Sequence, residues 1–490
     1  QPGTTSRGIV PTMYAYTSGT VAIGQDNIGF PGYNPFTPGN GGAAGGPQNL
    51  LQLYEDMNYI RAGHAFRFGG TYVHQRDNRT FAAYQTAANG LAGSAGIGPT
   101  LSALLAGTYH DINVAVDPQG KFSCAVTPSD CQVKLPVSGP NFTRSNRYHE
   151  FALYAQDSWK YNPRLTVNLG LRWEYFGVQH NARQEFDANW YAPGVGFADD
   201  NLVSYLAKGG ISLSPKSPIG RLWNPQYGNF GPRVGVAWDV FGDGKTSVRG
   251  GYGIGYERNF GNVTFNIIQN PPNYAVLAVS GPITTDNFGP LAGSSGSLSL
   301  PRVGARIVDP DIKTAHAHMW NGSIEHQFKG GVFWSAEYSG SKGVNLYSIA
   351  YPNQVGFGNL AGGTPCTGWT ADLSDNDCVA QVNPGWGNSI GYRGNQGFSI
   401  YHGLNNRLRV SNLFNSHADV SLNYTWSHAI DNLSSTFFET GVQSQYGNSN
   451  ITINNGNFVR GLMDPFHPGL DRGDAEFDIR QRVTIARAIV

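Results

Sequence analysis

Three short motifs are the places where this sequence could carry chemistry. The stretch DVFGDGKT at 239–246 matches the phosphate-binding loop pattern GxxxxGK[ST], except that Asp239 stands where the first glycine belongs. Such a loop has to follow a strand and open a helix, so that backbone N–H groups converge on the phosphate. Here the residues that follow alternate like a second strand, and the pattern therefore favours a tight hairpin turn.

The other two motifs also lack the surroundings that their chemistry needs. Ser339 and Lys342 match the S-x-x-K of penicillin-recognising enzymes, which place it at the start of a helix, whereas here it lies in a strand pattern. His316 and His318 share one face of a strand, but no third ligand lies at a telling spacing. We expect these histidines to be solvated or at the edge of a lumen, and we predict no catalytic residue, no metal site and no cofactor.

The composition excludes several classes of protein. The 490 residues include 33 Lys+Arg and 33 Asp+Glu, so the net charge is zero and nothing in it predicts a nucleic-acid partner. Charged residues make up 13% of the chain, about half of the roughly 25% that is usual in soluble domains. No apolar run reaches the about 20 residues that a membrane helix needs. A large β-rich chain remains, either secreted or in an outer membrane.

Alternation of apolar and polar residues at every second position dominates the chain. In the run 165–175 every odd position is apolar and every even position is small, polar or charged. Because a strand turns successive side chains to opposite faces, such a run has one apolar and one polar face. The expected strands are, in chain order, roughly 51–60, 64–75, 150–160, 165–176, 232–241, 246–258, 313–328, 332–347, 399–411, 417–430 and 477–490. The first ten form five hairpins with turns of a few residues.

The connections between the hairpins are of the opposite kind. They cover about 76–149, 177–231, 259–312, 348–397 and 431–476. All five are rich in Gly, Asn, Pro, Ser and Asp. Long loops that alternate strictly with short turns are typical of an outer-membrane barrel, which has short periplasmic turns and long extracellular loops. We therefore expect an all-β, antiparallel up-and-down transmembrane β-barrel, with outer-membrane lipid as its partner.

A barrel gives the side chains of its two faces different roles. The apolar faces would contact lipid, and tryptophans near the strand ends would lie at the membrane interfaces. These tryptophans are Trp159, Trp173, Trp238, Trp334 and Trp426. The alternative is that they are core residues of a large soluble β-protein.

The polar faces would line the lumen, with several charged residues pointing inward. These are Arg172, Glu174, Arg249, Glu257, Arg407 and Arg409. They would contact a plug or line a permeation path, or they would simply be hydrated as part of a polar wall.

Ligand binding, if present, is expected on the long loops. Their aromatic residues would stack on sugars or chelates, or would pack the loops onto one another. These residues are Tyr191, Tyr227, Tyr274, Trp369, Trp386 and Tyr446. The four cysteines form two close pairs, Cys124 with Cys131 and Cys366 with Cys378, and their spacing favours two loop disulfides over a zinc site or four reduced thiols.

The number of expected strands indicates a partial barrel. Bacterial single-chain barrels close with an even number of strands, whereas eleven are expected here. Residues 1–48 look like another long loop with no strand before it, and the last strand has no partner downstream. We expect residues 1–490 to be one segment of a larger barrel, without a plug domain, whose two edges pair with further strands.

Several stretches resemble a known family. FALYAQDSWK (151–160) and NPRLTVNLGLRWE (162–174) are similar to the barrel of TonB-dependent outer-membrane receptors. FGPRVGVAW (230–238), YSGSKG (338–343) and LNYTWSHAID (422–431) resemble its Oar-like branch, and they follow in that order. The resemblance implies a barrel of about 22 strands with a plugged lumen, and TonB as a partner of the full-length protein.

Three functions are compatible with these patterns. The first is a TonB-dependent receptor or transporter barrel that moves a bulky solute, a chelate or an oligosaccharide, across the outer membrane. The second is a structural or adhesive surface protein that displays long loops. The third is a large soluble secreted β-enzyme, which would carry clustered acidic residues at one strand edge. Nothing in the loops identifies the solute.

Overall fold

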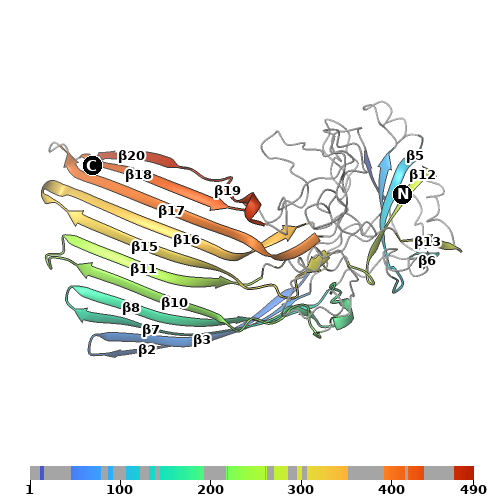
Figure 1. The fold of residues 1–490 in the computed structure, drawn as a ribbon, viewed down its shortest axis with the longest axis horizontal. Helices are drawn as coiled ribbons and strands as arrows, with labels where there is room; N and C mark the ends of the chain where they lie inside the picture. Colours follow the sequence, from blue (N-terminus) through green and yellow to red (C-terminus); the bar gives the residue numbers. More distant parts are fainter. Residues whose placement is uncertain are drawn as a thin grey trace.

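One large antiparallel sheet dominates the fold (Figure 1). The computed structural model describes residues 11–15, 46–78, 87–91, 106, 108–121, 132–137, 144–191, 217, 219–259, 261, 267, 270–284, 295–300, 306–350, 391–413, 418–434 and 468–489. The long strands of the sheet are β2 (Gln48–Arg61), β3 (His64–Asp77), β7 (Asn146–Asn162), β8 (Leu165–Phe176), β10 (Asn229–Asp239), β11 (Thr246–Glu257), β15 (Ala315–Gln327), β16 (Val332–Ala350), β17 (Gly391–Leu413), β18 (Ala418–Asp431) and β20 (Gln481–Ile489).

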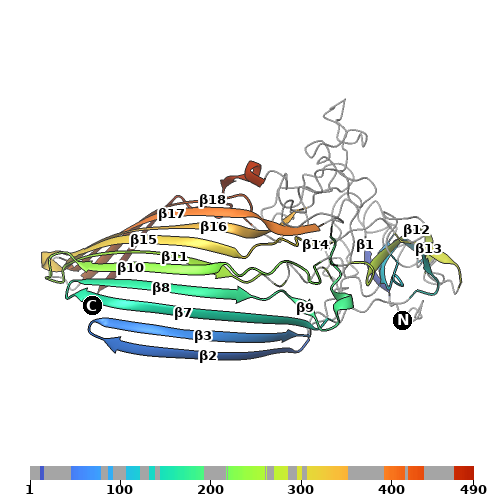
Figure 2. The same ribbon diagram turned by 60° about the horizontal axis from the view of Figure 1, so that its bottom comes forward.

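The long strands follow one another through the sheet in chain order. Each pairs antiparallel with the next, from β2 at one edge to β20 at the other. The sheet is curved rather than flat, and among the described residues its two edges do not pair with each other (Figure 2). The expected all-β, up-and-down fold is therefore confirmed as an open sheet, and each of the eleven expected strands overlaps one of these strands.

Short turns join the strands at one end of the sheet. Ala62 and Gly63 connect β2 to β3 with φ of 47° and 87°, the left-handed pair of a type I′ hairpin turn. Between β7 and β8 the side-chain oxygen of Asn162 accepts the backbone N–H groups of Arg164 (2.8 Å) and Leu165 (2.9 Å). These local bonds stop each strand and reverse the chain within a few residues.

Successive hairpins are staggered in one direction. Trp159 of β7 lies opposite the first residue of β3, and β7 continues to Asn162. Val410 of β17 lies opposite the first residue of β16, and β17 continues to Leu413. A stagger of constant sign tilts strands against the axis about which a sheet closes, as in barrels.

The strand register sorts the side chains into two faces, because directly opposed residues of antiparallel strands share a face. Val167 of β8 is opposite Trp159 on one side and Val236 on the other. We call the face with Val167 the outer face and the face with Arg172 the inner face.

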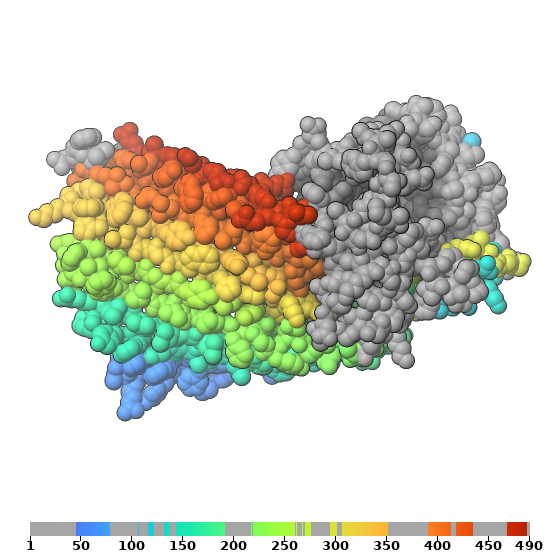
Figure 3. Space-filling model, in the orientation of Figure 1, coloured from blue at the N-terminus to red at the C-terminus, as the bar shows by residue number. Residues whose placement is uncertain are grey.

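No second layer of described residues covers the apolar outer face. Leu169, Leu171 and Val236 are 48%, 50% and 40% exposed. On the face seen in Figure 3, the strands from β2 to β20 lie bare, side by side. An apolar surface of this extent suits hydrocarbon, and it would be a severe liability in water.

The long connections contain short strands of their own, in addition to the eleven expected strands. β1 (Pro11–Ala15), β4 (Ala87–Leu91), β5 (Thr108–Val116) and β12 (Ala275–Thr284) form a small sheet beyond the loop end. β6 (Gln132–Lys134) pairs with β13 (Ser297–Ser299), and β9 (His180–Asn181), β14 (Arg306–Val308) and β19 (Gly473–Asp474) extend the large sheet. Among the described residues no helix is long and apolar enough to span a membrane.

A charge on the outer face tests its lipid contact. Leu169 lies four residues from the turn end of β8, so we expect Leu169→Arg to reduce the free energy of unfolding by about 2–4 kcal/mol in lipid vesicles. The control is Asn168→Arg on the inner face of the same strand, which loses one hydrogen bond from Ser158 and should cost about 1 kcal/mol. Denaturant unfolding of the full-length protein in vesicles measures both, and equal costs would contradict the two-face assignment.

Candidate functional site: the inner wall and the loop cap

All six of the charged residues expected in the lumen lie on the inner face. Arg172 is opposite Tyr154 and Gly231, Arg249 is opposite Ala237, and Arg407 is opposite Ser335 and Asn423. Glu174, Glu257 and Arg409 follow by the same alternation along their strands.

Some of the inner charges are paired and others are not. Arg172 Nε lies 2.9 Å from Glu174 Oε1, Arg249 lies 3.5 Å from Glu325, and Arg409 lies 2.8 Å from Asp419. Glu257 and Arg407 form no ion pair with any described residue. Ion pairs as exposed as these contribute at most about 1 kcal/mol each, so the wall is not held together by its charges.

A hollow of about 510 Å³ lies against the middle of the sheet. Gly251 and Gly253 of β11 form its floor on the inner face, because glycine leaves no side chain there. Its inner-face rim includes one large apolar side chain, Met319, together with a cation, an anion, an aromatic hydroxyl, an amide and two alcohols: Arg233, Glu337, Tyr401, Asn321, Ser339 and Ser341. Arg233 and Glu337 make no ion pair with a described residue, so both are available to a ligand.

A packed cap of loops stands at the loop end of the sheet. Its apolar core joins two connections to the ends of β15 and β16 and consists of Leu222, Trp223, Ile267, Val308, Ile312, Ala315 and Tyr347. Each of these side chains is less than 10% exposed. The connections therefore bury a hydrophobic core of their own beyond the sheet.

Two buried asparagines fasten the loops of the cap. The Asn189 amide donates to the carbonyl of Val308 (2.8 Å) and accepts the N–H of Val308 (2.9 Å). Asn270 does the same for Arg306, donating to its carbonyl (2.6 Å) and accepting its N–H (2.7 Å). Each side chain thus satisfies the N–H and the carbonyl of one residue that is distant in the chain, as a neighbouring strand would.

Arg258 ties the cap to strands on the far side of the inner face. It follows β11, yet its Nη1 donates to Glu150 of β7 (2.7 Å) and to Gln75 of β3 (2.9 Å). Its guanidinium also lies 5.3 Å from the ring centre of Tyr148. These contacts cross the inner side of the sheet at the loop end of β8 and β10. The sequence offered no signal for them, because the partners of Arg258 are 108 and 183 residues away in the chain.

The cap contains a buried carboxyl group. Burial raises the pKa of Asp187 to about 6, while the N–H of Asn181 on its Oδ2 (2.7 Å) and the charge of Arg144 act in the opposite direction. Burial also lowers the pKa of the Arg144 guanidinium to about 10. Arg144 and Arg183 lie over the ring of Phe186, at 4.5 and 4.6 Å.

The loop aromatics divide into three groups. Tyr191 and Tyr274 are buried, and the Tyr191 hydroxyl donates to the carbonyl of Leu222 (3.2 Å), so both pack loops onto one another. Tyr227 is 60% exposed and stacks on Tyr175 of the outer face, with ring centres 5.1 Å apart. Trp369, Trp386 and Tyr446 lie outside the described residues, as do all four cysteines.

The five tryptophans expected at the membrane interfaces all lie on the outer face. Trp159, Trp238 and Trp334 lie near the turns, whereas Trp173 and Trp426 lie eight residues up their strands. Eight residues correspond to about 26 Å along a strand, or about 20 Å of height at the strand tilt of about 40° found in barrels, which is slightly less than the apolar band of about 25 Å.

The motifs of the sequence have structural explanations. In the stretch 239–246 the Asp239 carboxylate accepts the N–H groups of Gly242 (2.9 Å) and Gly244 (3.0 Å), so it occupies the donors that a phosphate would need. Ser339 and Lys342 lie on opposite faces of β16. His316 and His318 occupy even positions of β15, as Trp320 and Ile324 do, so they lie on the outer face. This corrects the expectation that they lie at the edge of a lumen.

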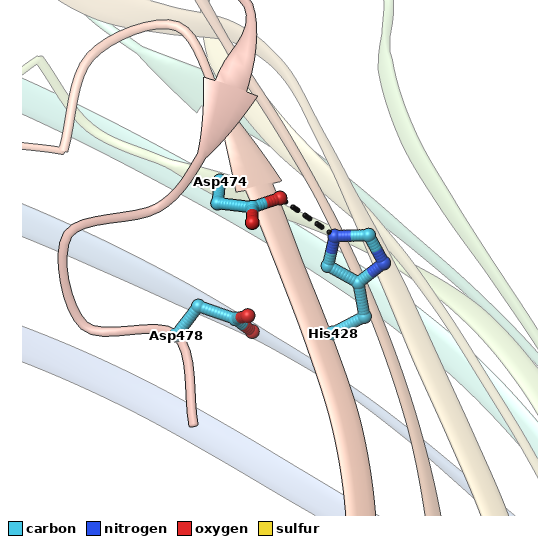
Figure 4. Close-up of side chains that lie close together, drawn as sticks. All are labelled: His428, Asp474 and Asp478. Atoms are coloured by element: carbon cyan, nitrogen blue, oxygen red, sulfur yellow. Dashed lines mark hydrogen bonds and ion pairs between the residues drawn. The ribbon is translucent and has the colours of Figure 1, made fainter. Parts of the chain in front are cut away.

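One group of side chains has the composition of a metal site. His428 Nε2 lies 3.0 Å from Asp474, with Asp478 beside them (Figure 4). Arg480, however, pairs with both carboxylates, at 2.7 Å from Asp474, and Asp478 also accepts the N–H of Ala429 (2.7 Å). The Arg480 guanidinium thus supplies the positive charge that a metal ion would supply. Together these contacts attach the segment before β20 to β18.

Comparisons with known proteins agree with this architecture. The family model described as "Outer membrane beta barrel domain" matches residues 1–488. No curated protein matches the chain.

Solved structures give distant matches. The outer membrane transporter YddB from Escherichia coli is 12% identical with a TM-score of 0.43, over 90% of this chain and 39% of that one. The FrpB iron transporter from Neisseria meningitidis is 10% identical with a TM-score of 0.33, over 78% and 36%. A mutant of the ferric enterobactin receptor PfeA from Pseudomonas aeruginosa is 10% identical with a TM-score of 0.36, over 78% and 39%.

The chain spans less than two fifths of the length of each of these three proteins, 36% to 39%. The family model, in contrast, extends across nearly all of its residues. The chain therefore belongs to the outer membrane beta barrel domain family, and its location is the bacterial outer membrane.

Proposed function

We propose that the sheet is part of the barrel wall of a TonB-dependent receptor that takes up a bulky solute across the outer membrane. The single observation that carries this proposal is the hollow on the inner face, rimmed by the unpaired Arg233 and Glu337. In the longer protein a plug would fill the lumen, and TonB would supply the energy for its movement.

The chemistry of the hollow favours a hydroxyl-rich solute such as an oligosaccharide. Serines, an amide, a tyrosine and one charge of each sign can donate to and accept from alcohol groups. Each ion pair along the inner face joins one cation to one anion, so these pairs add no net positive charge that would attract a polyanionic chelate.

A display function is the second candidate, and the loop cap favours it. The connections bury an apolar core and are fastened by Asn189 and Asn270, which makes a firm platform for binding at a surface. A soluble enzyme is disfavoured by the bare apolar outer face of the sheet.

Uptake by cells that carry the full-length protein, with and without TonB, separates transport from display. Radiolabelled maltoheptaose represents the oligosaccharide class and ferric citrate the chelate class. We expect import of maltoheptaose that stops when TonB is deleted. Adhesion that survives the deletion, without import of either probe, would instead support the display function.

Filling the hollow tests its role in transport. A Cβ on Gly253 meets only ordinary contacts, 3.4 Å from Arg233 Cγ, so Gly253→Leu places its side chain in the hollow without displacing backbone. We expect maltoheptaose import to fall by about tenfold, because the solute path narrows there. Gly235→Leu on the same face, outside the hollow and with equal room, is the control and should stay within about twofold of wild type.

The buried Asp187 makes the cap sensitive to pH. Its folded-state pKa of about 6 exceeds the reference value of 3.8, so its contribution to cap stability is full below about pH 4 and is lost as pH rises towards 6. We expect the amides of 181–191 to exchange hydrogen more slowly at pH 5 than at pH 7, after correction for intrinsic rates. Asp187→Asn should abolish this difference, and an unchanged pH dependence in the variant would show that another group is responsible.

A further inference from the structure

The outer face carries polar pairs that contact with hydrocarbon does not require. In each pair a tyrosine hydroxyl is hydrogen-bonded to Nδ1 of a histidine. The pairs are Tyr72 with His149 (3.1 Å), Tyr252 with His318 (2.7 Å) and Tyr338 with His402 (2.7 Å).

The three pairs share one geometry. Each tyrosine lies on a strand that runs towards the loops, and each histidine lies on the next strand, which runs back. The histidine is not directly opposite the tyrosine but lies two residues further along its strand towards the loops. The centres of the tyrosine and histidine rings are 6.1 to 6.2 Å apart. Because the same Tyr–His geometry recurs on three separate strand pairs, we infer that it is a structural motif of the outer face and not a chance contact.

The hydrogen bond determines what the other ring nitrogen can do. A neutral imidazole that accepts at Nδ1 carries its hydrogen on Nε2, and a protonated one carries a hydrogen on both nitrogens. In these two states Nε2 is a donor, whereas in the tautomer that donates from Nδ1 to the tyrosine oxygen it is an acceptor. An anion at Nε2 selects the donor states, because only they place a hydrogen there. Among the described residues, Nε2 of His149, His318 and His402 makes no hydrogen bond.

Two of the pairs converge on an unpaired lysine. Lys342 of β16 is directly opposite His318 of β15 and diagonal to His402 of β17. Its side chain is exposed and makes no ion pair with a described residue. We call Lys342, His318 and His402, with the tyrosines Tyr252 and Tyr338 that hold the two rings, the donor cluster.

Among the described residues, the outer-face surroundings of the donor cluster contain no counter-charge that is free to pair with it. The register places no aspartate or glutamate on the outer-face positions of β11, β15, β16 or of β17 from Ile400 to Val410. On the neighbouring β19, Asp474 is already bound by His428 and Arg480. Within the part of the chain that the structure describes, the cluster is thus a set of N–H donors and one ammonium with no anionic partner.

The height of the cluster places it at the headgroups of the outer leaflet. Lys342 lies ten residues from the turn end of β16, about 33 Å along the strand. With the strand tilt of about 40° found in barrels, this is about 25 Å above the turns, which equals the height of the apolar band.

We propose that the donor cluster binds a phosphate group of an outer-leaflet lipid, with lipid A as its occupant. The ammonium of Lys342 neutralises the phosphate, and the two Nε2–H groups donate to its oxygens. The tyrosines hold the rings in orientation from the hydrocarbon side. The proposal is independent of the solute that the barrel transports, because the cluster lies on the opposite face of the sheet from the hollow rim.

Retention of lipid tests the proposal. The full-length protein is placed in nanodiscs of phosphatidylcholine with a small fraction of lipid A, and the lipid that stays bound after extraction is counted by native mass spectrometry. We expect the triple variant Lys342→Gln, His318→Gln, His402→Gln to bind lipid A at least tenfold more weakly than wild type, since three charge-assisted bonds are lost. Dephosphorylated lipid A should bind the wild type no better than it binds the variant.

Two further variants keep the experiment decisive. His326→Gln changes a histidine on the same face of β15 at the turn end, where it bonds to Thr246, and should retain lipid A like wild type. Lys342→Arg preserves the charge and should also retain it, even if the triple variant fails to fold. The proposal would be overturned if the wild type retained lipid A and its dephosphorylated form equally. It would also be overturned if Lys342→Arg lost as much lipid A as Lys342→Gln.

Discussion

The constraint on which this structure depends is that a main-chain amide or carbonyl in hydrocarbon has no water to bond. An unpaired group there costs several kcal/mol, so a chain that crosses the bilayer by strands has to bond each strand to its neighbours. The continuous ladder from β2 to β20 meets this requirement for every strand between its edges. The two-face alternation follows from the ladder, because pairing leaves one row of side chains to lipid and the other to the lumen. The turns, the stagger of the hairpins and the aromatic rows then set how this ladder sits in the membrane.

The part of the fold inside the membrane was predictable from sequence because its constraints are local. Alternation in the run 165–175 and the turns at 61–64 and 239–246 are properties of adjacent residues. The strand ends were less predictable: β17 begins at Gly391 rather than near 399, and β7 at Asn146 rather than near 150. Beyond the apolar band the ladder continues, but both faces meet protein or water, so the alternation that reveals a strand disappears there.

The cap and the outer-face pairs could not be predicted in the same way. Asn189 and Asn270 each satisfy a residue that is distant in the chain, and a lone asparagine in a polar loop gives no sign of its partner. The outer-face histidines are a different case, because the signal was present. His316 and His318 lie at even positions of the strand, like Trp320 and Ile324, but they were expected to be solvated or at the edge of a lumen. The even position of these residues along the strand proved the better predictor of their face, since a strand cannot turn one residue inward without a bulge.

The same backbone constraint bears on the two edges of the sheet. β2 and β20 each bond to one neighbour among the described residues. β2 is exposed along its length and β20 is exposed from 481 to 487, with Ile60 79% and Ile485 70% exposed. In hydrocarbon each free edge would leave a row of unpaired amides and carbonyls, a cost far larger than the stability of a domain. In a membrane both edges therefore need strand partners. Because the hairpin stagger already has one sign throughout, strands that continue it from β20 back to β2 would close the wall with the tilt that it now has.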